Sequence, residues 1–221
     1  MAVTTVRGPR KGGRLGRPEG KTESREAILD AAERNFAERG YAAANLREIA
    51  QDAGVTQAMA NYWFGSKQEL FKQAYLRRGR WLAERRVALL AELTASTHYT
   101  VEDVLRAYIV PPFELRASVQ GQAFLRLQAR LHSEPDETAY ELRREVYDLP
   151  VRTYVGTLRR LLPAVPEERL YLCFAQLIGI YIYILSDAHR IEEISGKLRE
   201  TLPTGELVDE IVRFATAGFK G

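Results

Sequence analysis

The chain has 221 residues, of which 46% are hydrophobic and 28% are charged, and its formal net charge at pH 7 is +3. These values suit one or two soluble domains with a real core, and the near balance of charge excludes a uniformly basic surface as the evidence for nucleic-acid binding. One cysteine, Cys173, excludes an internal disulfide, and the charged N-terminus lacks the apolar run of a secretory signal. We therefore expect a cytoplasmic protein.

In residues 1–23, most of the basic residues stand next to or near glycines and prolines. Such a segment cannot bury a core, so we expect a disordered basic arm. Gly16-Arg17-Pro18, preceded by Arg14, resembles the core of an AT-hook, in which arginine enters a narrow A·T-rich minor groove. A solubilising tail without a defined contact is the alternative, and both remain open.

Helical spacing of apolar residues predicts a first helix over about 24–39, ended by Gly40. Two short helices joined by a tight turn follow. Asn45 and Thr56 stand at the two capping positions, and Gly54 lies between them, where a left-handed backbone is needed. Ser66 caps the next and much longer helix. Helix, glycine turn, short helix is the layout of a DNA-reading helix-turn-helix.

The second helix of this pair is poor in apolar surface, since only Met59, Ala60 and Phe64 are available for a core. An ordinary helical hairpin, which is the alternative, would need a full apolar stripe. Gln57 and Asn61 are four residues apart and share one face, and amide side chains pair with the edge of adenine. We therefore interpret this helix as one that reads DNA.

Residues 24–71 resemble, as one continuous pattern, the N-terminal domain of the TetR (tetracycline-repressor-like) family of transcriptional regulators. The remainder resembles the family in length and in its all-helical pattern. The chain departs from the family at Ala58, Ala60 and Asn61, where Gly, Leu and Tyr are frequent, and at Trp63, where His is frequent. These departures concern the base preference rather than the fold.

The resemblance implies an all-α protein with an N-terminal three-helix head over residues 24–69 and a C-terminal ligand-binding and dimerisation body over 70–221. It implies a homodimeric regulator, a repressor of transcription, that binds double-stranded operator DNA and leaves it when a small, largely apolar effector binds. We expect Gln57 and Asn61 at base edges, and Arg47, Thr56, Tyr62 and Lys67 at phosphates. The full set expected at the DNA is Arg14, Arg17, Arg47, Thr56, Gln57, Ala58, Asn61, Tyr62, Trp63 and Lys67.

The body is predicted to begin with a long helix over about 67–95, which links head and body and carries motion between them. Gly79 in its middle marks either a bend or a close packing contact. A further helix is predicted from residue 100 to the Pro111-Pro112 pair. Others are predicted over residues 120–133, 136–162, 167–186 and 204–218, with a short one possible within 190–200. Each proline of the pair frees a main-chain carbonyl one turn earlier, near Ala107 and Tyr108.

Aromatic side chains with a few polar heads gather on these helices and suit a mostly apolar effector pocket. Ordinary core packing is the alternative for each of them. If Glu114 were buried and unpaired, a cationic effector would be favoured over an anionic one. The residues expected at the pocket are Trp81, Tyr108, Phe113, Glu114, Phe124, Gln128, Tyr147 and Tyr154.

The longest apolar run, residues 170–185, is short for a membrane span and contains Gln176, so we expect a buried helix and no membrane contact. A helix that is apolar nearly all round must be covered on two sides. The resemblance implies that the last two helices form a four-helix dimer interface, and a central core helix in a monomer is the alternative. The residues expected at the interface are Phe174, Leu177, Ile180, Tyr181, Ile184, Leu207, Ile211 and Phe214.

Enzyme chemistry has little support, because the histidines are scattered and no nucleophile, phosphate-loop or paired-cysteine motif occurs. The segment from His132 to Asp136 has metal-capable side chains but no second cluster, and we expect neither a metal nor a cofactor. Two other functions remain open. One is a constitutive DNA-binding protein with a filled core, and the other is an enzyme acting on small aromatic compounds.

Overall fold

The computed structural model describes residues 19–133, 137–186, 190–196 and 203–221, and within these residues every regular element is a helix. Arg14 and Arg17 of the expected arm lie outside them. The helices are α1 (Glu19–Ala43), α2 (Leu46–Asp52), α3 (Gln57–Phe64), α4 (Lys67–Thr94), α5 (Val101–Arg116), α6 (Val119–Ser133), α7 (Glu137–Leu161), α8 (Glu167–Leu185), α9 (Arg190–Ser195) and α10 (Thr204–Lys220). The all-α prediction is confirmed.

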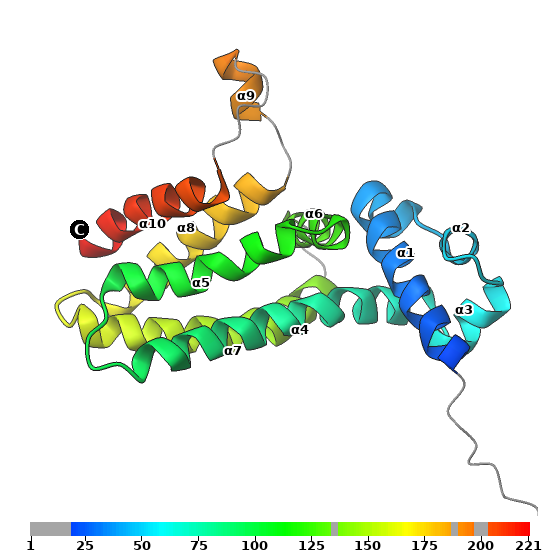
Figure 1. Cartoon of the computed structure of the whole chain (residues 1–221), viewed down its shortest axis with the longest axis horizontal. Coiled ribbons are helices and arrows are strands. Elements are labelled where there is room, and N and C mark those ends of the chain that lie inside the picture. Colours follow the sequence, from blue (N-terminus) through cyan, green and yellow to red (C-terminus); the bar gives the residue numbers. More distant parts are fainter. Residues whose placement is uncertain (1–18, 134–136, 187–189, 197–202) are drawn as a thin grey trace, which may run out of the picture.

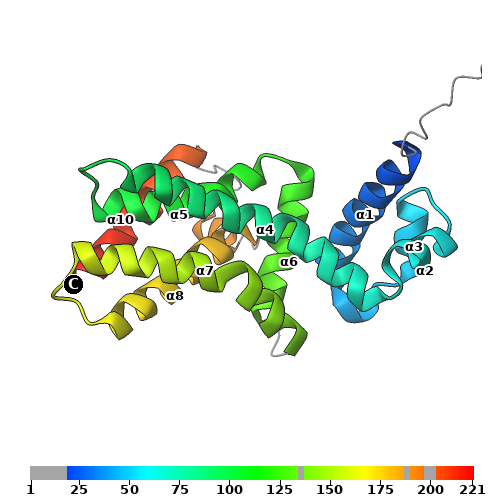
Figure 2. The ribbon, with the colours of Figure 1, turned by 90° about the horizontal axis from the view of Figure 1, so that it is seen from below.

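Helices α1 to α3 form a head at one end of the molecule, and α4 runs from this head along the body beside α7 (Figure 1). Helices α5, α8 and α10 lie together on one side of the α4–α7 pair. Helix α6 crosses the end of the body next to α1, as the view turned by 90° also shows (Figure 2). The long α4 therefore joins the two parts, as its predicted length indicates.

Helix α1 begins at Glu19, five residues earlier than the sequence pattern predicts. The pattern follows the apolar stripe, which starts at Ile28, whereas the first turns contain Glu19, Lys21 and Glu23, residue types that favour helices without an apolar stripe. Residues 19–23, expected in the arm, are thus helical.

Gly40 interrupts α1 as expected, with φ 77° and ψ 167°. This conformation is open to glycine and costly for other residues. It turns the chain so that the Tyr41 ring lies 6.1 Å from the Phe36 ring and 5.1 Å from the Phe71 ring, measured between centroids. An aromatic cluster therefore joins the end of α1 to α4.

Gly79 is a packing contact between α4 and α7. A Cβ atom at this position would lie 2.6 Å from Cγ2 of Val146, a distance that side-chain atoms do not tolerate. The lack of a side chain allows the two long helices to approach closely. Of the two interpretations of Gly79, close packing is the one that this geometry supports.

Candidate functional site

The helix-turn-helix is built by the capping residues that the sequence predicts. The Asn45 side chain accepts a 2.9 Å hydrogen bond from the main-chain N–H of Glu48 at the start of α2. The Thr56 hydroxyl accepts a 3.2 Å bond from Met59 N–H at the start of α3. Gly54 between them has φ 67°, which closes the turn. These bonds satisfy helix N–H groups that would otherwise lack partners.

Helix α3 buries one narrow side and leaves its polar side open. Ala60 and Phe64 are buried against α1 and α4, whereas Gln57 and Asn61 are exposed and Tyr62 is 73% exposed. Of the other expected DNA residues, Arg47, Thr56 and Ala58 are exposed, and Trp63 is partly buried. Met59, expected to face a core, is 39% exposed. The residues assigned to base reading therefore lie on an accessible helix face.

Lys67 occupies a different environment from the one expected. Its ammonium donates to the main-chain oxygens of Tyr41, Ala42 and Ala44 at 2.8, 3.3 and 3.0 Å, and it lies 4.5 Å from the centre of the Tyr41 ring. An ammonium has three N–H donors, and these three bonds use all of them. Lys67 thus fastens the first turn of α4 to the end of α1.

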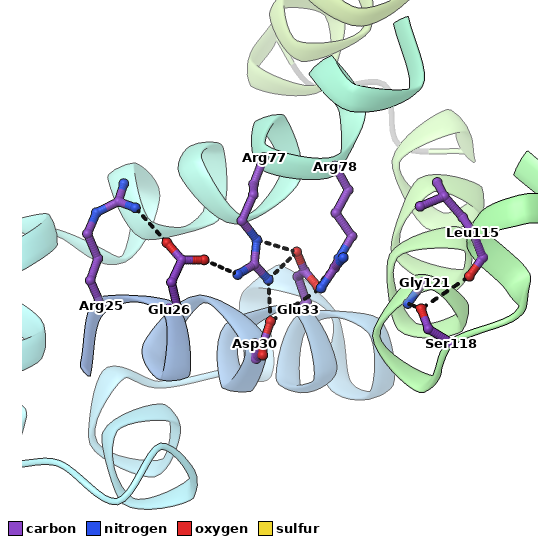
Figure 3. A network of polar contacts seen from close by, with 9 residues as sticks. All are labelled: Arg25, Glu26, Asp30, Glu33, Arg77, Arg78, Leu115, Ser118 and Gly121. Carbon is purple, nitrogen blue, oxygen red and sulfur yellow. Dashed lines mark hydrogen bonds and ion pairs between the residues drawn. The ribbon is translucent and has the colours of Figure 1, made fainter. Parts of the chain in front are cut away.

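A buried carboxylate ties α1 to α4 (Figure 3). Glu33 is fully buried and accepts hydrogen bonds from Nε and Nη2 of Arg77 at 3.1 and 2.7 Å, and from Nε of Arg78 at 2.7 Å. Arg77 also binds Asp30 at 2.5 Å and Glu26 at 2.8 Å. The two arginines lie where α4 leaves the head, so this network joins α4 to α1 at that point.

Helix α6 of the body makes the second contact with α1. Nη2 of Arg130 donates a 3.0 Å hydrogen bond to the main-chain oxygen of Glu38. The direction in which α6 leaves α5 is fixed by a tight turn, in which the Ser118 hydroxyl accepts a 3.0 Å bond from Gly121 N–H (Figure 3). A Cβ atom at Gly121 would lie 1.8 Å from the main-chain oxygen of Leu115, so only glycine fits this turn.

The centre of the body holds a buried arginine, Arg86 of α4, which the sequence analysis did not single out. Its Nε donates a 3.0 Å hydrogen bond to the main-chain oxygen of Tyr108. Pro112, four residues after Tyr108, has no N–H to donate a hydrogen bond to this oxygen. The carbonyl predicted to be free is therefore present, and Arg86 is its hydrogen-bond donor. The hydroxyl of Tyr154 donates a 2.8 Å bond to the main-chain oxygen of Arg86.

Six of the eight residues expected at the effector pocket lie in this core: Tyr108, Phe113, Phe124, Gln128, Tyr147 and Tyr154. The Gln128 amide donates to the Tyr147 hydroxyl. The other two expected residues lie outside this buried core. Trp81 is 40% exposed, and Glu114 is partly exposed and pairs with Arg85 at 3.2 Å, because both lie on outward faces of their helices. The condition for preferring a cationic effector, a buried and unpaired Glu114, is therefore not met.

The sequence did contain a signal for Arg86. Tyr75, Gly79, Leu82, Arg86 and Leu90 follow one another at helical spacing, and all five are buried. An arginine within an apolar stripe is a candidate for a buried charge, which proteins seldom retain without a partner. Tyr181, assigned to the dimer interface, belongs to the same core and lies with its ring 6.3 Å from that of Tyr108.

The expected dimer residues divide between the inside and the outside of the protomer. Four of them are buried within the protomer and pack in its own core: Phe174, Leu177, Tyr181 and Ile211. Ile180, Ile184 and Leu207 are partly exposed, and Phe214 is 69% exposed. The sequence could not separate these groups because α8 is apolar on every side.

The open face of α8 and α10 remains strongly apolar. It contains Leu172, which is 60% exposed, Tyr183 and Phe214, with small residues such as Gly179 between them. Helix α8 is long and apolar enough, by length and composition, to cross a membrane, and a third of its apolar window is buried. Exposed apolar patches of this kind on a folded domain mark interaction sites.

Comparisons with known proteins match both parts of the chain. Residues 28–74 match the family described as bacterial regulatory proteins, tetR family, and residues 106–218 match the tetracyclin repressor-like C-terminal domain. The HTH-type transcriptional repressor BepR of Brucella suis is 36% identical over 100 residues, 45% of this chain and 46% of BepR. BetI of Rhizobium meliloti, an HTH-type transcriptional regulator, is 46% identical over 46 residues, 21% of this chain and 23% of BetI. These matches span less than half the length of either relative.

Solved structures share the fold over almost the whole chain. AmtR of Mycobacterium smegmatis has a TM-score of 0.63 at 21% identity, covering 96% of this chain and 90% of AmtR. A regulator from Saccharomonospora viridis, solved in complex with choline, has a TM-score of 0.61 at 20% identity, covering 89% of this chain and 95% of that one. With both the head and the body accounted for, the chain belongs to the TetR family of bacterial transcriptional regulators.

Proposed function

We propose that the protein is a homodimeric repressor that binds a near-palindromic operator through α3 and leaves it when a small effector binds in the body. The observation that carries the proposal is the exposed polar face of α3, held in a capped helix-turn-helix by buried Ala60 and Phe64. The relative BepR is named a repressor, which agrees with this direction of control. A regulator of this kind works in the cytoplasm, where its DNA is.

In the proposed complex, Gln57 and Asn61 pair with base edges in the major groove. Arg47, Thr56 and Tyr62 bind phosphates, and Ala58 and Trp63 pack along the groove. Lys67 holds the end of α1 in place rather than touching the DNA. Arg14 and Arg17 of the basic arm are proposed to enter the adjacent minor groove, in which arginine is favoured where A·T pairs narrow it.

Dimerisation is proposed to occur through the open face of α8 and α10. Phe214, Leu172 and Tyr183 leave an apolar surface in water that a second copy would cover by the same surface about a two-fold axis. Small residues such as Gly179 allow two copies of α8 to approach closely, since a Cβ atom there would meet no described atom within 4 Å beyond its own stretch of helix. Covering this face also explains why a helix of such apolar character occurs in a DNA-binding protein.

The effector is proposed to act by changing the separation of the two heads. A ligand beside Arg86 pushes on α4, and the network of Glu33 with Arg77 and Arg78 carries that movement to α1. The effect requires a ligand that binds the DNA-free state more tightly than the DNA-bound state. Coupling of this kind is typically about 1–3 kcal/mol, so saturating effector should weaken operator binding roughly 5–150-fold.

Selection of binding sites from a random duplex library tests the proposal. The wild-type protein should enrich a near-palindrome whose half-sites are about 34–36 Å apart, or a multiple of this spacing. Gln57→Ala and Asn61→Ala should each relax the preference at defined base pairs by about 1–3 kcal/mol and leave the other positions unchanged. Glu84→Ala, an exposed change on α4 far from the head, is the control. Failure of the wild-type protein to enrich any sequence would refute the proposal.

A further inference from the structure

Polar groups without hydrogen-bond partners gather in the centre of the body. They are Nη1 and Nη2 of Arg86 and the hydroxyls of Tyr75, Tyr108 and Tyr181, all buried and unpartnered among the described residues. Buried polar groups are nearly always hydrogen-bonded, and an isolated exception is costly. A cluster of four such side chains indicates a place where another molecule supplies the missing partners.

The charge of this cluster is positive and uncompensated. An arginine side chain remains protonated inside a protein. Within the described part of the chain, no carboxylate pairs with Arg86, and neither Nη1 nor Nη2 makes a hydrogen bond of regular geometry. The groups around the guanidinium are the aromatic rings of Tyr108, Tyr181 and Tyr147 at 3.7, 5.3 and 5.9 Å from its carbon, and the Tyr181 hydroxyl is its nearest polar neighbour among them. Ring faces stabilise a cation in part, but a buried charge is normally paired with an opposite one.

The geometry defines how an anion would approach. The Tyr108 ring covers one face of the guanidinium, and the main-chain oxygen of Tyr108 occupies its Nε–H. Neither of these groups occupies the edge of the guanidinium that carries Nη1 and Nη2. Guanidinium N–H groups donate hydrogen bonds in the plane of the group, so an acceptor would approach this edge in that plane. Two parallel N–H donors at one edge match the two oxygens of a carboxylate. The hydroxyls of Tyr75 and Tyr181 are further donors in the same cluster.

We propose that this edge of Arg86 binds the acidic group of the effector, which is a small carboxylate with an apolar body. The apolar part would lie among the aromatic rings around Arg86, such as Tyr181 and Tyr147. The inference rests on the proposed function in one respect, namely that a ligand of the body is the effector. The related structure that holds choline carries a cation, whereas at this position a cation would be repelled by Arg86.

Calorimetry on the full-length protein without DNA tests the anion site. The probes are benzoate and octanoate, each compared with its amide and with the amine of the same body, benzylamine or octylamine. At least one acid should bind at least about 10-fold more tightly than its amide, and the amines should not bind, because only the acid matches the guanidinium. If neither acid binds more tightly than its amide, the proposal is wrong.

Variants locate the site. Arg86→Met, which keeps the length and apolar stem, should weaken binding of the acid about 10–100-fold, since it removes a charged pair of hydrogen bonds. Arg85→Met, which changes the neighbouring surface arginine that pairs with Glu114, should leave the affinity unchanged. Tyr181→Phe keeps the ring and removes one unpartnered hydroxyl, so it should weaken the acid several-fold even if Arg86→Met does not fold. The proposal would be overturned if Tyr181→Phe bound the acid with full affinity and Arg86→Met either did the same or did not fold.

This experiment separates the anion site from the regulatory function. If an acid binds at Arg86 but leaves operator affinity unchanged, the site stands and its role as an effector site fails. If a neutral compound releases the operator while no acid binds, the regulatory function stands and the anion site fails.

Discussion

The buried carboxylate of Glu33 in α1 accepts a 2.7 Å hydrogen bond from Nη2 of Arg77 in α4. This bond, with its neighbours from Arg78, joins the DNA-binding head to the helix that passes Arg86 in the centre of the body. One helix therefore connects the site proposed for the effector with α1, which packs against α3.

Removal of the Glu33 carboxylate should destabilise the protein strongly. We expect Glu33→Ala to lower the free energy of unfolding by about 3 kcal/mol, the lower end for a broken buried pair, because Arg77 and Arg78 retain some solvent contact. Glu26→Ala removes a half-exposed partner of the same Arg77 and should cost at most about 1 kcal/mol. Urea denaturation measures both values. If both substitutions lowered the free energy of unfolding by the same amount, the burial of Glu33 would not add to its contribution to stability.

Lys67 and Arg47 should respond differently to salt. Lys67→Met removes three bonds to main-chain oxygens, so the fold should lose about 1–3 kcal/mol while the salt dependence of operator binding stays the same. Arg47→Ala removes an exposed charge proposed to bind a phosphate and should reduce the slope of log K against log salt by about 1. Fluorescence anisotropy at several salt concentrations gives both slopes. A reduced slope in Lys67→Met would restore it as a phosphate contact.

Two glycines on packed helices should behave in opposite ways when replaced by alanine. Gly79→Ala places a methyl group against Val146 and should destabilise the protein by about 1–3 kcal/mol. The methyl group added by Gly156→Ala in α7 would meet no described atom within 4 Å beyond its own stretch of helix. This change should stabilise the protein by about 0.5–1 kcal/mol, since alanine is the better helix former. Thermal denaturation provides the comparison. The double change Gly79→Ala with Val146→Ala should recover part of the loss, and no recovery would contradict the packing explanation.

A charge on the open face of α8 and α10 should separate the dimer. Phe214→Glu should convert a particle of twice the 25.1 kDa chain mass into a single chain at micromolar concentration, because the carboxylate would be buried at the interface. Phe214 is 69% exposed in the protomer, so the fold itself should survive. Leu149→Glu, an equally exposed apolar position on α7, should remain a dimer. Sedimentation equilibrium distinguishes these results, and a monomeric wild-type protein would rule out the proposed interface.

The helices and the helix-turn-helix could be predicted because their signals are local. Asn45 and Thr56 cap their helices by bonds to residues three positions away, and Gly40 and Gly54 adopt the left-handed conformation that their positions require. Apolar spacing gave the other boundaries to within a few residues. The early start of α1 was missed because its first turns carry helix formers without an apolar stripe.

The contents of the core could not be predicted in the same way, because they depend on partners far along the chain. Lys67 meets oxygens more than 20 residues earlier, and Arg86 meets a carbonyl 22 residues later that a proline has freed. Sequence spacing predicts which side chains share a helix face but not which helix covers that face. For the same reason the sequence does not reveal that Tyr181 lies in the cluster around Arg86.

The affinity ratio between the selected operator and a scrambled duplex of equal length and composition, measured for the wild-type protein at one physiological salt concentration, tests the central claim most directly. A protein that reads bases through α3 should prefer the operator by about 10³-fold or more, as specific DNA-binding proteins do. The preference should fall by roughly 5–150-fold for each of Gln57→Ala and Asn61→Ala, in line with the loss of one bidentate base contact. A wild-type ratio near one would show attraction to phosphates alone and would contradict the account of this protein as a sequence-specific regulator.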